Sequence, residues 1–330
     1  MSNNLDFLYY CDSYPAIGMG HLKRGIDIVR ELLKQEPELQ VAMAGHFSDS
    51  AWSFLQKLKP KAVPSFRDEL PPKKVKLAML DTINPGDAST IPLKKAQKIK
   101  SISNRLFTIN TGFETYIPDC IDGIINYIPI AKYSGNIDVK KYLGVEFAPV
   151  SPEFTPKKWK TNRHIVCIIG GNQDQYGPKK LSEKLVENLP PEYTIDFILS
   201  PHFPEKKRQQ LQHNYPKINF YQNLESIAEY MRRAQAVITT YGNATWEALT
   251  LHRPVFIVSY LEFQKRFAEY LAEQEYAVDL GYFENLATDK MGLLTKIDFQ
   301  KARIEKLKGE FQKPGIINIA NKIREEIHVS

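Results

Sequence analysis

Short apolar runs rich in β-branched residues alternate with stretches of helical periodicity along most of this 330-residue chain. The runs that predict strands in the first half are LDFLYY, LQVAMAG, KLAMLD, RLFTIN and DGIINYIP. Those in the second half are HIVCIIGG, YTIDFILSP, INFYQN, AVITT and PVFIV. Because parallel strands need a crossover between them, usually a helix, this alternation predicts an α/β fold with parallel sheets.

The chain is long enough for two domains rather than one ordinary core. The segment SPEFTPKKWKTNR, residues 151–163, contains two prolines and four Lys or Arg residues and has no periodicity, which is typical of a linker. We therefore expect one domain over 1–155, a second over 163–315, and a C-terminal helix over 316–330. Two such α/β domains are expected to bind their ligand in a cleft at the carboxyl ends of their strands.

Charge and cysteine content exclude several classes of protein. The 44 basic and 38 acidic residues give a net charge of +6, without a recognisable nucleic-acid motif, so we expect no nucleic-acid partner. Basic clusters such as Lys94, Lys95, Lys98 and Lys100 indicate either a solvated surface or contact with an anionic partner, including a membrane. The three cysteines have no metal-ligand spacing, and Cys167 is expected to be buried. With no signal peptide and no apolar stretch of spanning length, the sequence predicts a cytoplasmic protein.

The stretch YYCDSYPAIGMGHLKRGIDIVREL, residues 9–32, places two glycines and a histidine where a strand gives way to a helix. It is not a dinucleotide fingerprint, because Arg24 stands where the third glycine would be, and the phosphate-loop pattern is also absent. Gly18 and Gly20 predict a turn that brings backbone amides to a helix start, which favours negative charge. His21 can act there as a general base, although a capping or surface role is also open.

Two stretches of the second half predict ligand-binding turns. In CIIGGNQDQYG, residues 167–177, a strand runs into Gly170 and Gly171, which is either a ligand loop or an ordinary strand-to-helix turn. In ITTYGNATWEALTLHRPVFIVSYLEFQ, residues 238–264, Gly242 turns the chain and Asn243 is placed to cap a helix whose free amides suit a diphosphate.

Further residues of the second stretch are assigned by their chemistry. Glu247, one turn into that helix, suits the hydroxyls of a ribose, and Gln264 follows the next strand, where it can reach a sugar. For Trp246 and the aromatic residues that follow it we expect core packing rather than base stacking; these are Phe263, Phe267 and Tyr270.

Together these motifs resemble the GT-B superfamily of nucleotide-sugar enzymes. CDSYPAIGMGHLKRGIDI is similar to the opening of the UDP-sugar hydrolases of pseudaminic acid biosynthesis and their spore-coat relatives (PseG/SpsG-like), and YLGVEFAPVSPEF to the end of their first domain. The lipid-linked peptidoglycan N-acetylglucosaminyltransferases (MurG-type) are a more distant likeness. The chain departs from the hydrolases at Tyr10 and Ile83, on the side of the cleft that holds the sugar.

The resemblance implies two Rossmann-like domains that face each other across a cleft, no cofactor and no metal. It implies that His21 is the base, that the second domain holds the nucleotide, and that the C-terminal helix packs back on the first domain. The residues expected to bind substrate are Asp12, Gly18, Gly20, Arg24, Asp81, Gly170, Gly171, Asn172, Asp174, Tyr241, Gly242, Asn243, Ala244, Thr245, Glu247 and Gln264.

Three functions remain open at this stage. The first is an inverting glycosyltransferase that moves a sugar, expected to come from a UDP-sugar, to a small-molecule or lipid-linked acceptor. The second is a UDP-sugar hydrolase that uses water as the nucleophile and releases a free amino or deoxy sugar. The third is a nucleotide-sugar-binding protein without catalysis. The altered sugar side favours transfer, and the presence of His21 argues against a purely binding role.

Overall fold

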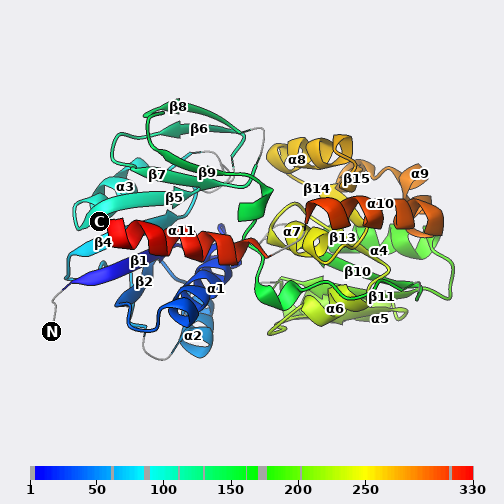
Figure 1. Ribbon diagram of the computed structural model, residues 1–330. Coiled ribbons are helices and arrows are strands. Elements are labelled where there is room, and N and C mark those ends of the chain that lie inside the picture. Colours follow the sequence, from blue (N-terminus) through cyan, green and yellow to red (C-terminus); the bar gives the residue numbers. More distant parts are fainter. Residues whose placement is uncertain are drawn as a thin grey trace. The chain divides into compact units, whose positions relative to one another are not determined.

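The structure is a computed structural model that describes residues 4–60, 63–84, 90–110, 112–128, 131–160, 162–169, 177–200, 203–311 and 314–329 (Figure 1). The chain divides into two compact units. The first comprises Met1–Pro152 together with Pro314–Ser330, and the second comprises Glu153–Lys313. Each is described by itself below.

The first unit is built on a seven-stranded sheet in the order β3-β2-β1-β4-β5-β7-β9, with all of its pairings parallel. Its strands are β1 (Leu5–Cys11), β2 (Val41–Gly45), β3 (Ser65–Arg67), β4 (Val75–Asp81), β5 (Ser103–Ile109), β7 (Gly123–Asn126) and β9 (Lys140–Leu143). Two further short strands pair only with each other, β6 (Glu114–Ile117) and β8 (Lys132–Gly135). All five strands expected in this half are present, and β3, β6, β8 and β9 are additional.

Four α-helices accompany this sheet: α1 (Gly20–Gln35), α2 (Asp49–Leu58), α3 (Leu93–Lys100) and α11 (Gly315–Val329), with 3-10 turns η1 (Val145–Phe147) and η2 (Pro152–Phe154). Gly25 allows α1 to lie close to β1, since a Cβ there would come within 2.4 Å of the Tyr9 ring. That close approach leaves the Tyr9 hydroxyl pointing along the sheet toward Asp81 at the end of β4.

The last helix of the chain, α11, belongs to the first unit and packs against α1 (Figure 1). One face of this helix is apolar and buried, and it carries Ile316, Ala320, Ile323 and Ile327. Glu326 on the same helix is buried and accepts a hydrogen bond from Arg105 Nη1 of β5 at 2.5 Å. The helix is therefore held on the sheet by both apolar packing and an ion pair.

The second unit repeats the architecture with a six-stranded parallel sheet in the order β12-β11-β10-β13-β14-β15. Its strands are β10 (His164–Ile169), β11 (Thr194–Leu199), β12 (Ile218–Tyr221), β13 (Ala236–Thr239), β14 (Val255–Ser259) and β15 (Ala277–Tyr282). Its helices are α4 (Gly177–Asn188), α5 (Glu205–Asn214), α6 (Ala228–Arg233), α7 (Asn243–Thr250), α8 (Glu262–Glu273), α9 (Thr288–Met291) and α10 (Ile297–Glu310), with turns η3 (Phe283–Asn285) and η4 (Gly292–Leu294).

The core of the second unit lies under the strands, where Cys167 is fully buried as expected. Trp246 and Phe267 are also core residues, whereas Phe263 and Tyr270 are only partly covered. Most of the predicted linker lies within this unit, because Phe154 is buried and the Trp159 indole donates to Gln235 O at 2.9 Å. No helix in the described part of the chain has the length and apolar character needed to span a bilayer.

Candidate active site

The loop between β1 and α1 is fixed by hydrogen bonds to its own backbone. Ser13 Oγ donates to Gly18 O at 2.8 Å, and the amides of Ile17 and Gly18 both donate to Tyr14 O, at 2.9 and 2.8 Å. Gly18 has a φ of +80°, a left-handed conformation that favours glycine. The loop thus ends in a defined turn, and α1 begins at Gly20 beside the carboxyl edge of the sheet.

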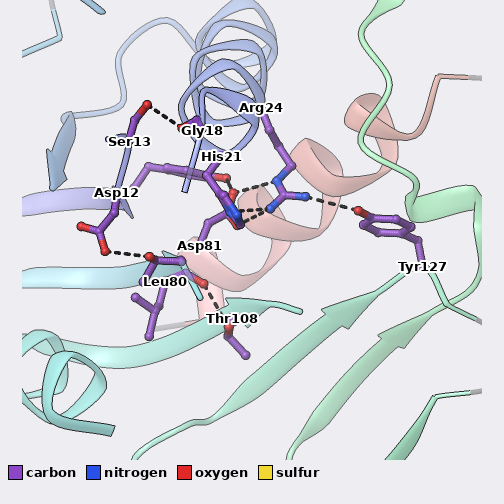
Figure 2. A network of polar contacts seen from close by, with 11 residues as sticks. Asp12, Ser13, Gly18, His21, Arg24, Leu80, Asp81, Thr108 and Tyr127 are labelled. Carbon is purple, nitrogen blue, oxygen red and sulfur yellow. Dashed lines mark hydrogen bonds and ion pairs between the residues drawn. The ribbon is translucent and has the colours of Figure 1, made fainter. Parts of the chain in front are cut away.

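His21, the second residue of α1, does not cap its helix but points to Asp81, the last residue of β4 (Figure 2). Its Nδ1 lies 2.7 Å from Asp81 Oδ1, with 13% of the histidine side chain exposed and Asp81 fully buried. An ionised carboxylate only accepts, so this contact places the proton on Nδ1. Arg24 Nη2, which only donates, lies 3.0 Å from the same nitrogen, the longer of the two contacts. The other ring nitrogen, Nε2, is then the one that can take up a proton from a substrate.

The Asp81 carboxylate is shared with two more side chains. Arg24 Nε donates to Asp81 Oδ2 at 2.7 Å, Arg24 Nη2 donates to Oδ1, and the Tyr9 hydroxyl donates to Oδ2. Arg24 Nη1 reaches Tyr127 Oη at 3.4 Å (Figure 2). Burial alone would raise the pKa of Asp81, but the Arg24 and His21 side chains hold that pKa well below its usual range. Asp81 is therefore a buried anion whose charge is balanced mainly by Arg24.

Asp12, directly after β1, anchors a second polar network at the same edge. It is fully buried and accepts from Thr82 Oγ1 at 2.6 Å, from the His46 amide at 3.0 Å and from Lys95 Nζ. Lys95 lies on α3, which packs on β4 and β5, so this ion pair joins the end of β1 to the helix that follows β4 in the chain. Lys76 and Lys100 are also paired, with Asp6 and Asp122. These lysines of the basic clusters therefore have acidic partners within the unit.

Three of the residues expected to bind substrate in this unit lie beneath the surface. Arg24 is 3% exposed, and Asp12 and Asp81 are 0% exposed. All three are bonded to protein groups, which suits residues that orient His21 and the loop. Gly18 and Gly20 belong to the turn that precedes His21. The motifs did not identify Tyr9, Thr82, Lys95 or Tyr127; the position of Thr82 directly after a strand end was the one available signal.

In the second unit, α7 begins where the sequence placed a ligand-binding turn, but its N-cap differs from the expectation. Gly242 is the N-cap and Asn243 the first helical residue, because the Thr245 hydroxyl accepts from the Gly242 amide at 3.3 Å. Tyr241 stacks on Phe267 with ring centroids 3.9 Å apart. Ala244, Thr245 and Glu247 follow within the helix, and Glu247 is 6% exposed. A Cβ on Gly242 would meet nothing within 4 Å, which leaves space beside the helix start.

Gln264, expected to reach a sugar hydroxyl, is 3% exposed and lies in the first turn of α8. Its side-chain oxygen accepts from the amides of Tyr260 and Leu261 at 3.1 and 3.3 Å, so it closes the turn between β14 and α8. Gly170, Gly171, Asn172 and Asp174 lie outside the described residues. Among the residues that are described, no group of three or more His, Cys, Asp or Glu side chains is placed to hold a metal ion.

Comparison with known proteins finds relatives in sequence and in fold, although no family model matches the chain. The chain is 25% identical over 285 residues to the UDP-2,4-diacetamido-2,4,6-trideoxy-beta-L-altropyranose hydrolase of Campylobacter jejuni, covering 83% of this chain and 99% of that protein. It is also 25% identical over 297 residues to the spore coat polysaccharide biosynthesis protein SpsG of Bacillus subtilis, covering 83% of each.

Among solved structures, the fold is similar to that of MurG from Acinetobacter baumannii, with a TM-score of 0.65 and 11% identity over 98% of this chain and 100% of that one. Two parallel α/β units and this likeness identify the fold as GT-B, with two Rossmann-like domains. Taken with the sequence relatives, the chain is similar to the PseG/SpsG-like group of GT-B proteins.

Proposed function

We propose that the protein is an inverting, nucleotide-sugar-dependent glycosyltransferase in which His21 is the catalytic base. The observation that carries the proposal is the His21–Asp81 contact, which directs the Nδ1 proton to a buried carboxylate and leaves Nε2 to accept a proton. Asp81, Arg24 and Tyr9 are positioning residues in this scheme, because they hold the imidazole rather than touch the substrate.

The proposed reaction balances as a single displacement. His21 Nε2 takes the proton of an acceptor hydroxyl, and the acceptor oxygen forms a bond to the anomeric carbon of the donor sugar. The bond between that carbon and the diphosphate oxygen breaks, and the nucleoside diphosphate leaves with the electron pair. Attack from the side opposite the leaving group inverts the anomeric configuration.

The nucleotide is assigned to the second unit. The start of α7, where the helix dipole is positive, would stabilise the leaving diphosphate. Gly170 and Gly171, which lie outside the described residues, stay predicted to contribute. Glu247, near the start of α7, would accept hydrogen bonds from the ribose hydroxyls. UDP is the proposed nucleotide because the Campylobacter jejuni relative is named for a UDP-sugar.

Replacement of His21 tests the base. His21→Ala should lower kcat about 10²- to 10⁴-fold, the usual contribution of a general base, and leave the affinity for UDP unchanged. Calorimetric titration with UDP and steady-state kinetics measure the two quantities separately. Turnover that survives the replacement contradicts the assignment of the base.

Hydrolysis is the second candidate, and the likeness to the Campylobacter jejuni hydrolase over nearly its whole length favours it. Water would take the place of the acceptor hydroxyl in the same site. Incubation of the protein with UDP-sugars and no acceptor separates the two reactions. Rapid release of free sugar and UDP would establish the hydrolase, whereas release that depends on an added acceptor would establish transfer. A thermal-shift panel of nucleotide-sugars identifies the donor, since a bound ligand stabilises the native state.

An anionic acceptor or membrane surface is proposed for the basic clusters of the first unit. Lys94 and Lys98 lie on exposed positions of α3, beside the exposed Leu93. Flotation with liposomes that contain anionic lipid tests this contact, and equal recovery with neutral liposomes would contradict it.

A further inference from the structure

A second histidine–carboxylate pair lies at the same edge of the sheet as His21 and Asp81. His46 directly follows β2, Asp68 directly follows β3, and the His46 Nδ1 is hydrogen-bonded to Asp68 Oδ1. The strand order β3-β2-β1-β4 brings both residues to the carboxyl edge on which β4 ends with Asp81. Neither residue belongs to the motifs discussed above.

The backbone holds this pair in place through the loop that carries His21. The His46 amide donates to Asp12 Oδ1 at 3.0 Å, and the Ser13 amide donates to His46 O at 2.9 Å. Ser13 is the residue whose hydroxyl binds Gly18 O, just before α1. The position of His46 is therefore coupled to the turn that positions His21.

Asp68 has an unfavourable backbone conformation for a residue with a side chain. Its φ is +63°, in the left-handed region, and its amide donates to Gly45 O at 2.9 Å. The His46 and Asp68 side chains are 56% and 52% exposed, and an ion pair so exposed contributes little to stability. Strained backbone that stability does not explain is concentrated at ligand sites.

The exposed groups of the pair match a neutral sugar better than a phosphate. The Tyr14 ring lies edge-on to the His46 imidazole, with centroids 5.1 Å apart. With Nδ1 directed to Asp68, His46 offers Nε2 to a ligand. The nearby cation, Arg67, is shared between Asp68 Oδ2 at 3.7 Å and Asp49 Oδ1 at 2.8 Å, so the local charge is on balance acidic and would repel an anion. An aromatic ring beside planar hydrogen-bonding groups suits the apolar face and the polar substituents of a pyranose ring.

The spacing of the strands also fits one ligand that reaches both pairs. Only β1 separates β2 from β4, so the ends of these strands are about 10 Å apart. We propose that His46, Asp68 and Tyr14 form a subsite for a hydroxylated or acetamido-substituted pyranose next to the reacting centre. This subsite rests on the proposed function, and its sugar is that of either the donor or the acceptor.

The test uses three variants of the full chain. His46→Ala removes the imidazole, and Asp68→Asn replaces one accepting oxygen of the carboxylate with a donating amide nitrogen. Asp68→Gly removes the carboxylate while relieving the left-handed backbone. His328→Ala is the matched control, because His328 forms a similarly exposed pair with Glu36 between α11 and the residue after α1. Retained thermal stability of Asp68→Gly shows that any loss of binding is not a folding defect.

The donor probe is UDP-2,4-diacetamido-2,4,6-trideoxy-β-L-altropyranose, and the acceptor probe is methyl N-acetyl-β-D-glucosaminide added to the UDP-saturated protein. We expect the three variants to weaken binding of one probe about fivefold to tenfold, with the affinity for UDP alone unchanged and with no effect in His328→Ala. The probe that is affected identifies the source of the sugar.

Two results from the variants would overturn the subsite. One is unchanged binding of both probes by all three variants, and the other is an equal loss of affinity for UDP alone. A wild-type protein that binds UDP but neither probe also contradicts the subsite while leaving the nucleotide assignment intact. A wild-type protein that binds neither UDP nor the donor instead refutes the proposed function, and the subsite with it.

Discussion

The two units share a strand order but differ in the side chains at the carboxyl edge of the sheet. In the first unit, Asp12 and Asp81 end or follow adjacent strands and are buried in ion pairs with Lys95 and Arg24. In the second unit, β13 ends in Thr239, and Thr240, Tyr241 and Gly242 lead into α7. In the proposed function, one edge would move a proton, and the other would hold the nucleotide.

The second unit also contains a buried histidine–aspartate pair, but at the opposite end of its sheet. His164, the first residue of β10, lies 2.9 Å from Asp196 through Nε2, and Asn219 donates to the other Asp196 oxygen at 2.8 Å. The pair has the same chemistry as His21 and Asp81 but is not at the edge where parallel sheets bind ligands. Position in the fold, rather than residue type, therefore separates the catalytic candidate from the structural one.

The largest expected effect is on stability, from Asp81→Asn. The replacement leaves the buried Arg24 guanidinium without its counter-ion, so the free energy of unfolding should fall by about 3–5 kcal/mol. Denaturant unfolding measures this change. Asp196→Asn is the comparison and should cost less, because its partner His164 need not be charged. Equal losses would show that the two pairs do not differ in this way.

The contribution of the Asp81 ion pair to stability should also depend on pH. The pKa of Asp81 is lowered in the folded state, so its contribution to stability is present above the usual carboxyl pKa of about 3.9 and is lost as the pH falls from there toward the folded pKa. Unfolding of the wild type and of Asp81→Asn between pH 7 and pH 2 should therefore converge at the acid end. A constant difference across that range would contradict the ion pair.

The second largest effect is expected on nucleotide affinity. Glu247→Gln removes a charged acceptor and should weaken UDP binding about 10- to 100-fold, while binding of a nucleotide that lacks the ribose hydroxyls stays the same. Calorimetry with UDP and its 2′,3′-dideoxy analogue measures both. The first unit supplies the control, since His21→Ala should bind the two nucleotides like the wild type.

A smaller effect is expected on the pH dependence of stability from Arg24→Gln, which removes the guanidinium that holds the pKa of Asp81 low. The pKa of Asp81 should rise, so the loss of stability in acid should begin at a higher pH than in the wild type. Denaturant unfolding between pH 7 and pH 2 measures this change, and His164→Gln should leave the profile in place. An unchanged profile after Arg24→Gln would show that Arg24 does not balance Asp81.

The smallest effects come from the two glycines at the helix starts. Gly18→Ala places a side chain at a φ of +80° and should cost about 1 kcal/mol of stability. A side chain at Gly242 would meet open space, and its φ is not left-handed, so Gly242→Ala should leave stability unchanged. We expect it to affect only the binding of a ligand that lies against the start of α7. Thermal melts with and without UDP distinguish the two. A loss of stability in Gly242→Ala equal to that in Gly18→Ala would contradict the proposed difference between the two glycines.

Much of the fold was predictable because its strands are long apolar runs with clear turn signals. The strands missed in the first unit are short, and β3, β8 and β9 are largely exposed, so they carry little hydrophobic pattern. β15 was missed for another reason, since Asp279 and Gly281 interrupt its apolar run. Tertiary pairing, rather than local propensity, forms these strands.

The candidate site was predictable in part. His21, Arg24 and Asp81 were named from motifs, and the structure brings all three into one network. The sequence did not show that Arg24 and Asp81 are buried partners, nor that Tyr9, Thr82 and Lys95 join them. Such contacts depend on which strands are neighbours. Tyr9 and Asp81 are 72 positions apart in the chain, and Asp12 and Thr82 are 70 apart.

The return of α11 to the first unit has a consequence for the order in which this protein is made. The ribosome completes residues 153–313 before it reaches the helix that covers α1 and supplies Glu326 to Arg105. We therefore expect the first unit to keep that apolar surface uncovered until residues 314–329 have been made, whereas all residues of the second unit precede them in the chain. A nascent chain halted before residue 314 would present that uncovered surface to chaperones.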